Sequence, residues 1–206
     1  NPSGFVARNF GSPTRVIRNS KKIFFLLSHN IMKKVLLFPG AFNPPHYGHS
    51  EIVELALQKN VFDELWIMPS GKRKDKTIDI SYIHRTNLGK LFVSYLKTRI
   101  KLPIILLEDE LNDSEGRYTD KIMCEIKSKE GFAITQLIGS DGIMNLYNAD
   151  KSILDKEKFI VAQRVGDILP NDFPQKNVDI IDGASSKISS TQIRKMIKTM
   201  IGNMLN

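Results

Sequence analysis

The chain has 206 residues, of which 41% are hydrophobic and 25% charged, as expected for a globular protein with one substantial core. Its longest apolar runs have about five residues, far too few to span a bilayer. The formal net charge is +8, but residues 1–31 hold five basic and no acidic residues, and the +3 left for the remainder does not favour a nucleic-acid-binding protein.

Residues 1–31 contain no methionine, and Met32 directly precedes the first expected strand. We therefore expect residues 1–31 to be a non-native or disordered extension and residues 32–206 to form one domain. The alternative is an organellar presequence, because the segment contains Arg and Ser but no acid. The single cysteine, Cys124, excludes an intramolecular disulfide and fits a reducing compartment. The expected location is cytoplasmic, or organellar if the presequence is genuine.

Apolar runs and helical periodicity alternate along the rest of the chain. Strands are expected over residues 34–38, 62–68, 103–107, 132–138, 159–162 and 179–181. Helices are expected over residues 48–59, 82–96, 118–127 and 190–200. This alternation predicts an α/β fold with a Rossmann-like, doubly wound parallel sheet. Because the chain has neither GxGxxG nor a complete Walker A loop, ordinary dinucleotide-binding and P-loop sites are disfavoured.

Two histidines lie where the first strand gives way to the first helix. His46 and His49 are three residues apart, so they can converge on one side of the first helical turn. A strand's carboxyl end beside a helix start favours an anion, and Gly48 permits close backbone approach. No metal site is expected, because only His29, His84 and one cysteine could complete it. The pattern therefore indicates a phosphate ligand.

A second polar motif, ISSTQIR, begins the last expected helix. Ser189 or Ser190 is a natural N-cap, Thr191 lies in the first turn and Arg194 follows one turn later. Taken alone, this pattern is typical of a capped helix with a surface arginine. Paired with the histidine loop, it supplies a second anion cradle of hydroxyls, amides and a guanidinium.

The two motifs together resemble those of a known superfamily. GAFNPPHYGH resembles the (T/H)xGH signature of the nucleotidyltransferases, and ISSTQIR resembles their ISSTxxR signature. Within that superfamily the chain is most similar to the nicotinate and nicotinamide mononucleotide adenylyltransferases. The segments that carry this closer resemblance are NPPHYGH, MPSG, His84-Arg85, YTDKI at 118–122, IGSD at 138–141 and FIVAQRVG at 159–166.

The resemblance implies transfer of AMP from ATP to a pyridine mononucleotide in NAD biosynthesis, with Mg²⁺ and release of pyrophosphate. From the residues themselves we expect no protein metal ligands and no membrane partner, and a nucleic-acid partner is disfavoured. A homo-oligomer is left open. The implied catalytic residues are His46, His49 and Arg194. The implied substrate-binding residues are Gly40, Ala41, Phe42, Asn43 and Gly48 at the first loop, Gly139 and Asp141 for the adenosine ribose, and Ser189, Ser190 and Thr191 for the leaving phosphates.

Several alternatives remain open at this point. Pantetheine-phosphate adenylyltransferases share a segment similar to FPGAF. Class I tRNA synthetases share an HxGH element, although this chain shows no KMSKS-like loop, and a non-catalytic nucleotide- or RNA-binding relative would keep the fold. The acceptor depends on residues 70–85, which include a basic loop at 72–76, and on residues 142–150, where Tyr147 is the one aromatic.

Overall fold

The computed structural model describes residues 32–71, 81–112, 131–163, 166–167, 169–170, 173–174, 176–185 and 188–204. The helix expected at 118–127, the basic loop at 72–76 and Cys124 lie outside them. The strands are β1 (Lys33–Gly40), β2 (Glu64–Pro69), β3 (Ile104–Leu106), β4 (Phe132–Gly139), β5 (Lys158–Gln163) and β6 (Val178–Asp182). The helices are α2 (Tyr47–Lys59), α3 (Tyr82–Lys97), α4 (Asp109–Asn112), α6 (Ser140–Ala149), α7 (Ile153–Lys156) and α8 (Ser190–Met204).

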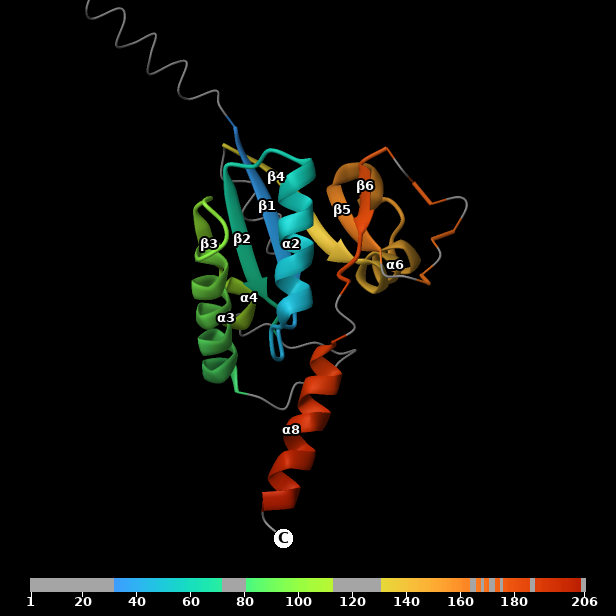
Figure 1. The fold of residues 1–206 in the computed structure, drawn as a ribbon. Helices are drawn as coiled ribbons and strands as arrows, with labels where there is room; N and C mark the ends of the chain where they lie inside the picture. Colours follow the sequence, from blue (N-terminus) through green and yellow to red (C-terminus); the bar gives the residue numbers. More distant parts are fainter. Residues whose placement is uncertain are drawn as a thin grey trace, which may run out of the picture. The chain divides into compact units, whose positions relative to one another are not determined.

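The six strands form one sheet in the order β3-β2-β1-β4-β5-β6 (Figure 1). Every neighbouring pair is parallel, so the prediction of a Rossmann-like parallel sheet is confirmed. The chain runs outward from β1 to β3 and then returns to place β4 on the other side of β1. This reversal makes the β1/β4 boundary the topological switch point, outside whose carboxyl end ligands bind in open α/β sheets.

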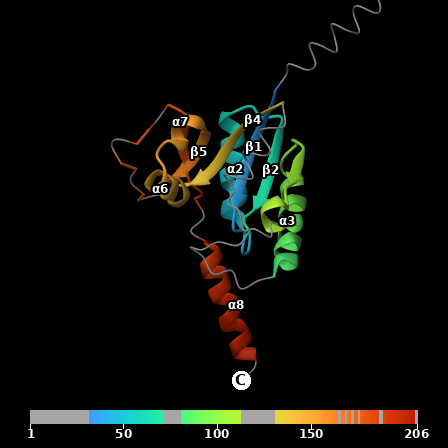
Figure 2. The ribbon, with the colours of Figure 1, turned by 180° about the vertical axis from the view of Figure 1, so that it is seen from behind.

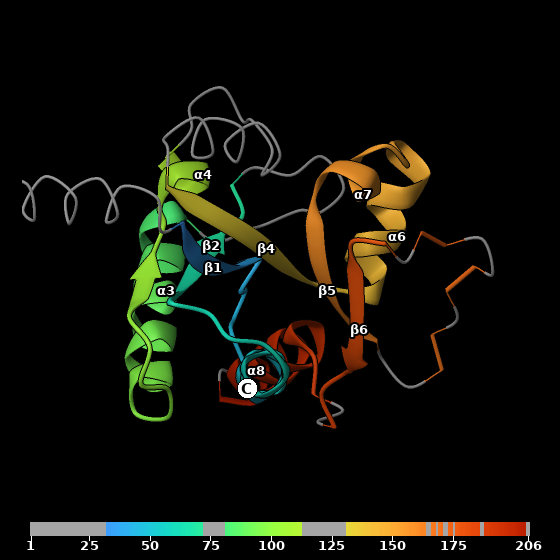
Figure 3. The same ribbon diagram turned by 90° about the horizontal axis from the view of Figure 1, so that it is seen from above.

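Helices cover both faces of the sheet, because successive strand residues point to opposite sides. On β1, Leu36 and Phe38 join the cluster that includes Val53 of α2 and Phe92 of α3. Val35 and Leu37 face the opposite way. Figures 2 and 3 show α6 and α7 on the side of the sheet away from α2. Because β1 lies between β2 and β4 and both of its faces are buried, its sequence is a continuous apolar run.

The structure adds three helices that the sequence analysis did not predict, namely α4, α6 and α7. The ten-residue α6 contains Gly142 and two asparagines, which are poor helix formers. It is stabilised instead by burial, since Ile143 and Tyr147 enter a cluster with Phe159 of β5. Tertiary packing therefore overrides weak local propensity here.

The single tryptophan belongs to the core, as its position in a strand suggests. Trp66 is 5% exposed, its indole Nε1 donates to Glu64 Oε2 at 2.8 Å, and its ring lies 5.0 Å from that of Phe132. Among the described residues, no helix combines the length and the apolarity needed to cross a membrane.

The central strand β4 provides a test of the core. Leu137 is fully buried on β4, so Leu137→Ala is expected to lower the free energy of unfolding by about 2–5 kcal/mol, because it leaves a cavity. Ile180 on the edge strand β6 is 41% exposed, and Ile180→Ala is expected to cost less than about 1 kcal/mol. Equilibrium urea unfolding of both variants measures the difference, and equal losses would contradict this account of the core.

Candidate active site

The loop that follows β1 is shaped by an inward-turned phenylalanine. Phe42 has a positive φ of 44° and is 2% exposed. Its ring meets that of Phe38 edge-on at 5.2 Å and lies 5.5 Å from that of Phe92. A Cβ at Gly40 would come within 2.9 Å of the Phe42 ring. Glycine at position 40 therefore lets the loop fold back onto the core at the strand's end.

His46 and His49 lie together at the start of α2, as their spacing predicts. Their ring centroids are 3.8 Å apart, and both side chains are half-buried. The backbone N–H of His46 donates to the ring nitrogen Nδ1 of His49 at 3.1 Å. The backbone N–H of His49 donates to the carbonyl oxygen of His46 at 2.9 Å. Because Nδ1 of His49 accepts a hydrogen bond, the neutral ring carries its proton on Nε2, which makes Nε2 a donor.

The first turn of α8 docks directly on this loop. Arg194 Nη1 donates to the carbonyl oxygen of Asn43 at 2.6 Å, and its Nη2 donates to Thr191 Oγ1 at 3.1 Å. The Ser190 hydroxyl donates to the carbonyl oxygen of Pro44 at 2.8 Å. The structure thus brings the two sequence motifs into contact, beyond the carboxyl ends of the strands (Figure 1).

A reciprocal capping box starts α8 and identifies Ser189 as its N-cap. The Ser189 N–H donates to Gln192 Oε1 at 2.8 Å, and the Gln192 N–H donates to Ser189 Oγ at 3.2 Å. This is the S-x-x-Q pattern of a capped helix. The helices α2 and α8 therefore both begin at the loop after β1, and the positive ends of both helix dipoles lie beside it.

Gly139 and Asp141 lie on the other side of the switch point, where β4 passes into α6. The register between β1 and β4 ends at the pair Leu37 and Gln136, three residues before Gly40 and Gly139. A Cβ at Gly139 would meet nothing within 4 Å, and Asp141 is exposed in the first turn of α6. Both expected ribose-binding residues thus lie at the carboxyl edge of the strand that neighbours β1.

Arg85 at the start of α3 is a buried residue whose place the sequence analysis missed. It is 4% exposed, and its guanidinium donates to the carbonyl oxygen of Ala41 at 3.1 Å. Burial lowers the pKa of Arg85, and the nearby charge of Glu110 opposes this shift. The periodic signal was present, because Arg85 precedes Gly89, Phe92 and Leu96 at helical spacing and these are all buried.

Tyr147 of α6 packs in the core beside β5. Its ring is buried 5.5 Å from that of Phe173, and its hydroxyl accepts a hydrogen bond from Lys151 at 2.8 Å. Tyr147 therefore belongs to the hydrophobic cluster between α6 and β5.

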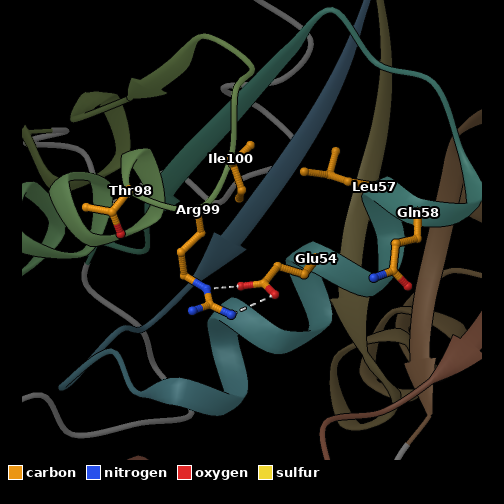
Figure 4. Close-up of a pocket in the computed structure, with 6 residues that line it drawn as sticks. All are labelled: Glu54, Leu57, Gln58, Thr98, Arg99 and Ile100. Atoms are coloured by element: carbon orange, nitrogen blue, oxygen red, sulfur yellow. Dashed lines mark hydrogen bonds and ion pairs between the residues drawn. The ribbon is translucent and has the colours of Figure 1, made fainter.

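A separate cavity of about 460 Å³ lies between α2 and the end of α3 (Figure 4). Its lining residues are Glu54, Leu57, Gln58, Thr98, Arg99 and Ile100. Arg99 forms a two-point ion pair with Glu54, with Nε to Oε1 at 2.5 Å and Nη2 to Oε2 at 3.1 Å. None of the expected site residues lines this cavity, so it is distinct from the histidine loop.

Comparison with known proteins shows which family this chain belongs to. Residues 37–196 match the model of the cytidylyltransferase-like family, from β1 through Arg194. The chain belongs to the cytidylyltransferase-like family. The match contains both motifs that meet at the loop after β1, so the superfamily resemblance drawn from those motifs is confirmed.

Individual relatives match over most of this chain and most of their own length. The chain is 30% identical to the probable nicotinate-nucleotide adenylyltransferase of Bacillus licheniformis, over 81% of this chain and 87% of that protein. It is 29% identical to the corresponding probable enzyme of Fusobacterium nucleatum, over 80% and 88%. It is 28% identical to the nicotinate-nucleotide adenylyltransferase of Bacillus subtilis, over 82% and 87%.

Solved structures agree with the fold. The nicotinic acid mononucleotide adenylyltransferase of Plasmodium falciparum complexed with APC matches with a TM-score of 0.60 and 20% identity, over 79% of this chain and 83% of that one. The same enzyme complexed with NaAD matches with a TM-score of 0.56. The cytidylyltransferase-like fold is therefore shared with these structures.

The capping box of α8 can be tested locally. Ser189→Ala removes the hydroxyl oxygen that accepts from the Gln192 backbone N–H, while the Ser189 backbone N–H keeps its bond to Gln192 Oε1. The loss of this cap is expected to cost the helix about 1 kcal/mol. Faster amide hydrogen exchange in the first turn of α8 measures this loss. Thr199 lies in the same helix, and its hydroxyl donates only to the carbonyl oxygen of Lys195, so Thr199→Ala is the matched control. Equal exchange in the two variants would remove Ser189 as the cap.

Proposed function

We propose that this chain transfers the AMP moiety of ATP to nicotinate mononucleotide and releases pyrophosphate, a step of NAD biosynthesis. The observation that carries the proposal is the hydrogen bond from Arg194 to the carbonyl oxygen of Asn43, because it joins the two halves of one phosphate cradle. Relatives that cover four fifths of the chain and are named for this reaction support it. The single cysteine supports a reducing, cytoplasmic location.

The reaction needs no protein nucleophile. An oxygen of the mononucleotide's 5′-phosphate attacks the α-phosphorus of ATP, a new P–O bond forms, and the bond between the α-phosphorus and the bridging oxygen breaks. The electron pair of that bond leaves with pyrophosphate. Catalysis then consists of alignment and stabilisation of the charge that develops on phosphate oxygens.

The histidine loop is suited to the α-phosphate. Nε2–H of His49 is a fixed donor, because its Nδ1 accepts from the backbone of His46. A preorganised donor strengthens as charge grows on a non-bridging oxygen in the transition state. His46, whose ring lies against that of His49, is proposed as its partner. Gly48 keeps the backbone close, since a Cβ there would come within 3.2 Å of the His46 ring.

The start of α8 is suited to the phosphates that leave. Ser190, Thr191 and Arg194 present hydroxyls and a guanidinium at a helix N-terminus, where the dipole favours negative charge. We assign them to the β- and γ-phosphates, with Ser189 as the residue that caps the helix. The loop residues from Gly40 to Asn43 are proposed to line the mononucleotide site, and Gly139 and Asp141 the ribose of ATP.

Magnesium is expected to enter with ATP. In the described part of the chain no three His, Cys, Asp or Glu side chains converge on a point. Mg²⁺ commonly keeps several waters and binds through substrate phosphates rather than in an all-protein cage. A cradle made of hydroxyls, imidazoles and a guanidinium fits ATP that binds as its magnesium complex.

The proposed reaction is tested by measuring pyrophosphate release from ATP and Mg²⁺ with three acceptors, each in a separate assay. Nicotinate mononucleotide is expected to support the highest kcat/KM, nicotinamide mononucleotide a lower one, and 4′-phosphopantetheine none. Turnover with 4′-phosphopantetheine alone would overturn the proposal in favour of a pantetheine-phosphate adenylyltransferase. RNA binding at physiological salt without adenylyl transfer would instead favour a nucleic-acid-binding relative.

The two ring nitrogens of His49 can be separated by substitution. His49→Asn can still accept the His46 N–H but has no donor at the Nε2 position, whereas His49→Gln carries an amide that reaches it. The asparagine variant is expected to keep its thermal stability and lose about 10²–10³-fold in kcat. The glutamine variant should recover at least about tenfold of that loss. An asparagine variant with wild-type kcat would remove His49 from the chemistry.

A further inference from the structure

Arg85 lies in an environment that is unusual for a charged side chain. It is 4% exposed, and a buried charge is costly unless it is paired and hydrogen-bonded. The carboxylate of Glu110, itself 3% exposed, lies close enough to oppose the fall in the pKa of Arg85 that burial causes. The guanidinium also donates to three backbone carbonyl oxygens, those of Ala41, Ser70 and Gly71.

These three carbonyl groups lie just past the ends of two neighbouring strands. The register between β1 and β2 ends at the pair Gly40 and Pro69, and the Ser70 N–H donates to the carbonyl oxygen of Gly40 at 2.8 Å. Beyond that point the sheet no longer joins the two loops. Arg85 continues the connection, because one nitrogen, Nη2, reaches both Ala41 and Ser70.

The loop after β2 also packs closely against the backbone of α4. A Cβ at Gly71 would come within 2.1 Å of the backbone carbonyl oxygen of Glu110, so this loop runs directly against α4. The Gly71 carbonyl oxygen in turn accepts from Arg85 Nη1 at 3.5 Å. The guanidinium therefore links α3 and the loop beside α4 to the loop after β1.

The loop after β1 is consequently held between two arginines. Arg85 holds the carbonyl group of Ala41, and Arg194 holds that of Asn43 two residues later. Between them lies Phe42, which has a positive φ and a buried ring that contacts those of Phe38 and Phe92. Loss of either arginine frees one end of a three-residue segment that the proposed function places against the reacting groups.

We propose that Arg85 is a positioning residue for adenylyl transfer, which sets the loop after β1 by joining its backbone to the loop after β2. The inference rests on the proposed function. Arg85 does not touch substrate, since its side chain is buried beneath the loops. Its effect is expected in kcat, because a shift of about 1 Å in a substrate-positioning segment costs about 10²-fold in rate.

The kinetic test uses Arg85→Gln and Arg85→Lys, with Arg99→Gln as the matched control. Arg99 is an arginine whose ion pair joins the end of α3 to α2 away from the loops. For Arg85→Gln, kcat per folded molecule is expected to fall at least about 30-fold, more than KM rises for either substrate, and Arg85→Lys should recover part of it. Arg99→Gln should stay within about twofold of wild type. A merely structural role would lower the melting temperature and leave kcat per folded molecule within twofold, which would overturn the inference.

A second measurement does not depend on turnover. Amide hydrogen exchange at Phe42, Asn43 and Gly71 is expected to quicken in Arg85→Lys, with β5 and α6 unchanged. Unchanged exchange at the three amides would overturn the inference even if kcat fell. If the wild-type protein transferred AMP to no acceptor, the proposed function would fail, while this exchange measurement would still decide whether Arg85 sets the loop.

Discussion

One hydrogen bond carries the organisation of this site, the one that Arg194 donates to the carbonyl oxygen of Asn43. The two residues are 151 positions apart, and each belongs to a motif that is ambiguous alone. A charge-assisted bond of this length is stronger than a neutral one, and the hydroxyl of Ser190 adds a second bond to the adjacent residue. A capped surface helix and a histidine loop become one cradle because these contacts hold them together.

The topology of the sheet explains why the contact is available. The strand order places β1 beside β4, so the loops that follow both strands lie at the switch point. Helices α2 and α8 then start at the same loop, and their dipoles add at one place. Phosphate groups carry the largest negative charge in the proposed substrates. At the loop after β1, the two helix N-termini and Arg194 provide positive charge without a cluster of lysines among the described residues of the loop.

Much of this could be predicted from the sequence. The apolar run of β1 and the periodicity of α2 and α3 predicted these three elements correctly, because burial there is continuous and local. The spacing of His46 and His49 predicted their convergence, since three residues make nearly one helical turn. The helices α4, α6 and α7 could not be found this way, because α6 forms through contacts with β5 rather than through its own propensity.

Arg85 shows the same limit at the level of one side chain. Its position on the buried stripe of α3 was readable, but its partners were not, since Ala41 lies 44 residues away and Ser70 15. The sequence could equally have placed the guanidinium in solvent. Only the tertiary arrangement shows that it binds backbone carbonyl groups, which carry no side-chain signature. The tautomer of His49 likewise follows from a backbone contact rather than from residue identity.

The attachment of α8 has a thermodynamic consequence for ligand affinity. None of its described residues is buried, so its helical state depends on its capping box and on the contacts of its first turn. Under the proposed function, molecules in which that turn is frayed lack half of the cradle, and the apparent affinity for a nucleoside triphosphate falls in proportion to the fraction that is formed. By linkage, a ligand that binds only the formed turn must stabilise it. The proposed function therefore couples the folding of the first turn of α8 to the binding of substrate.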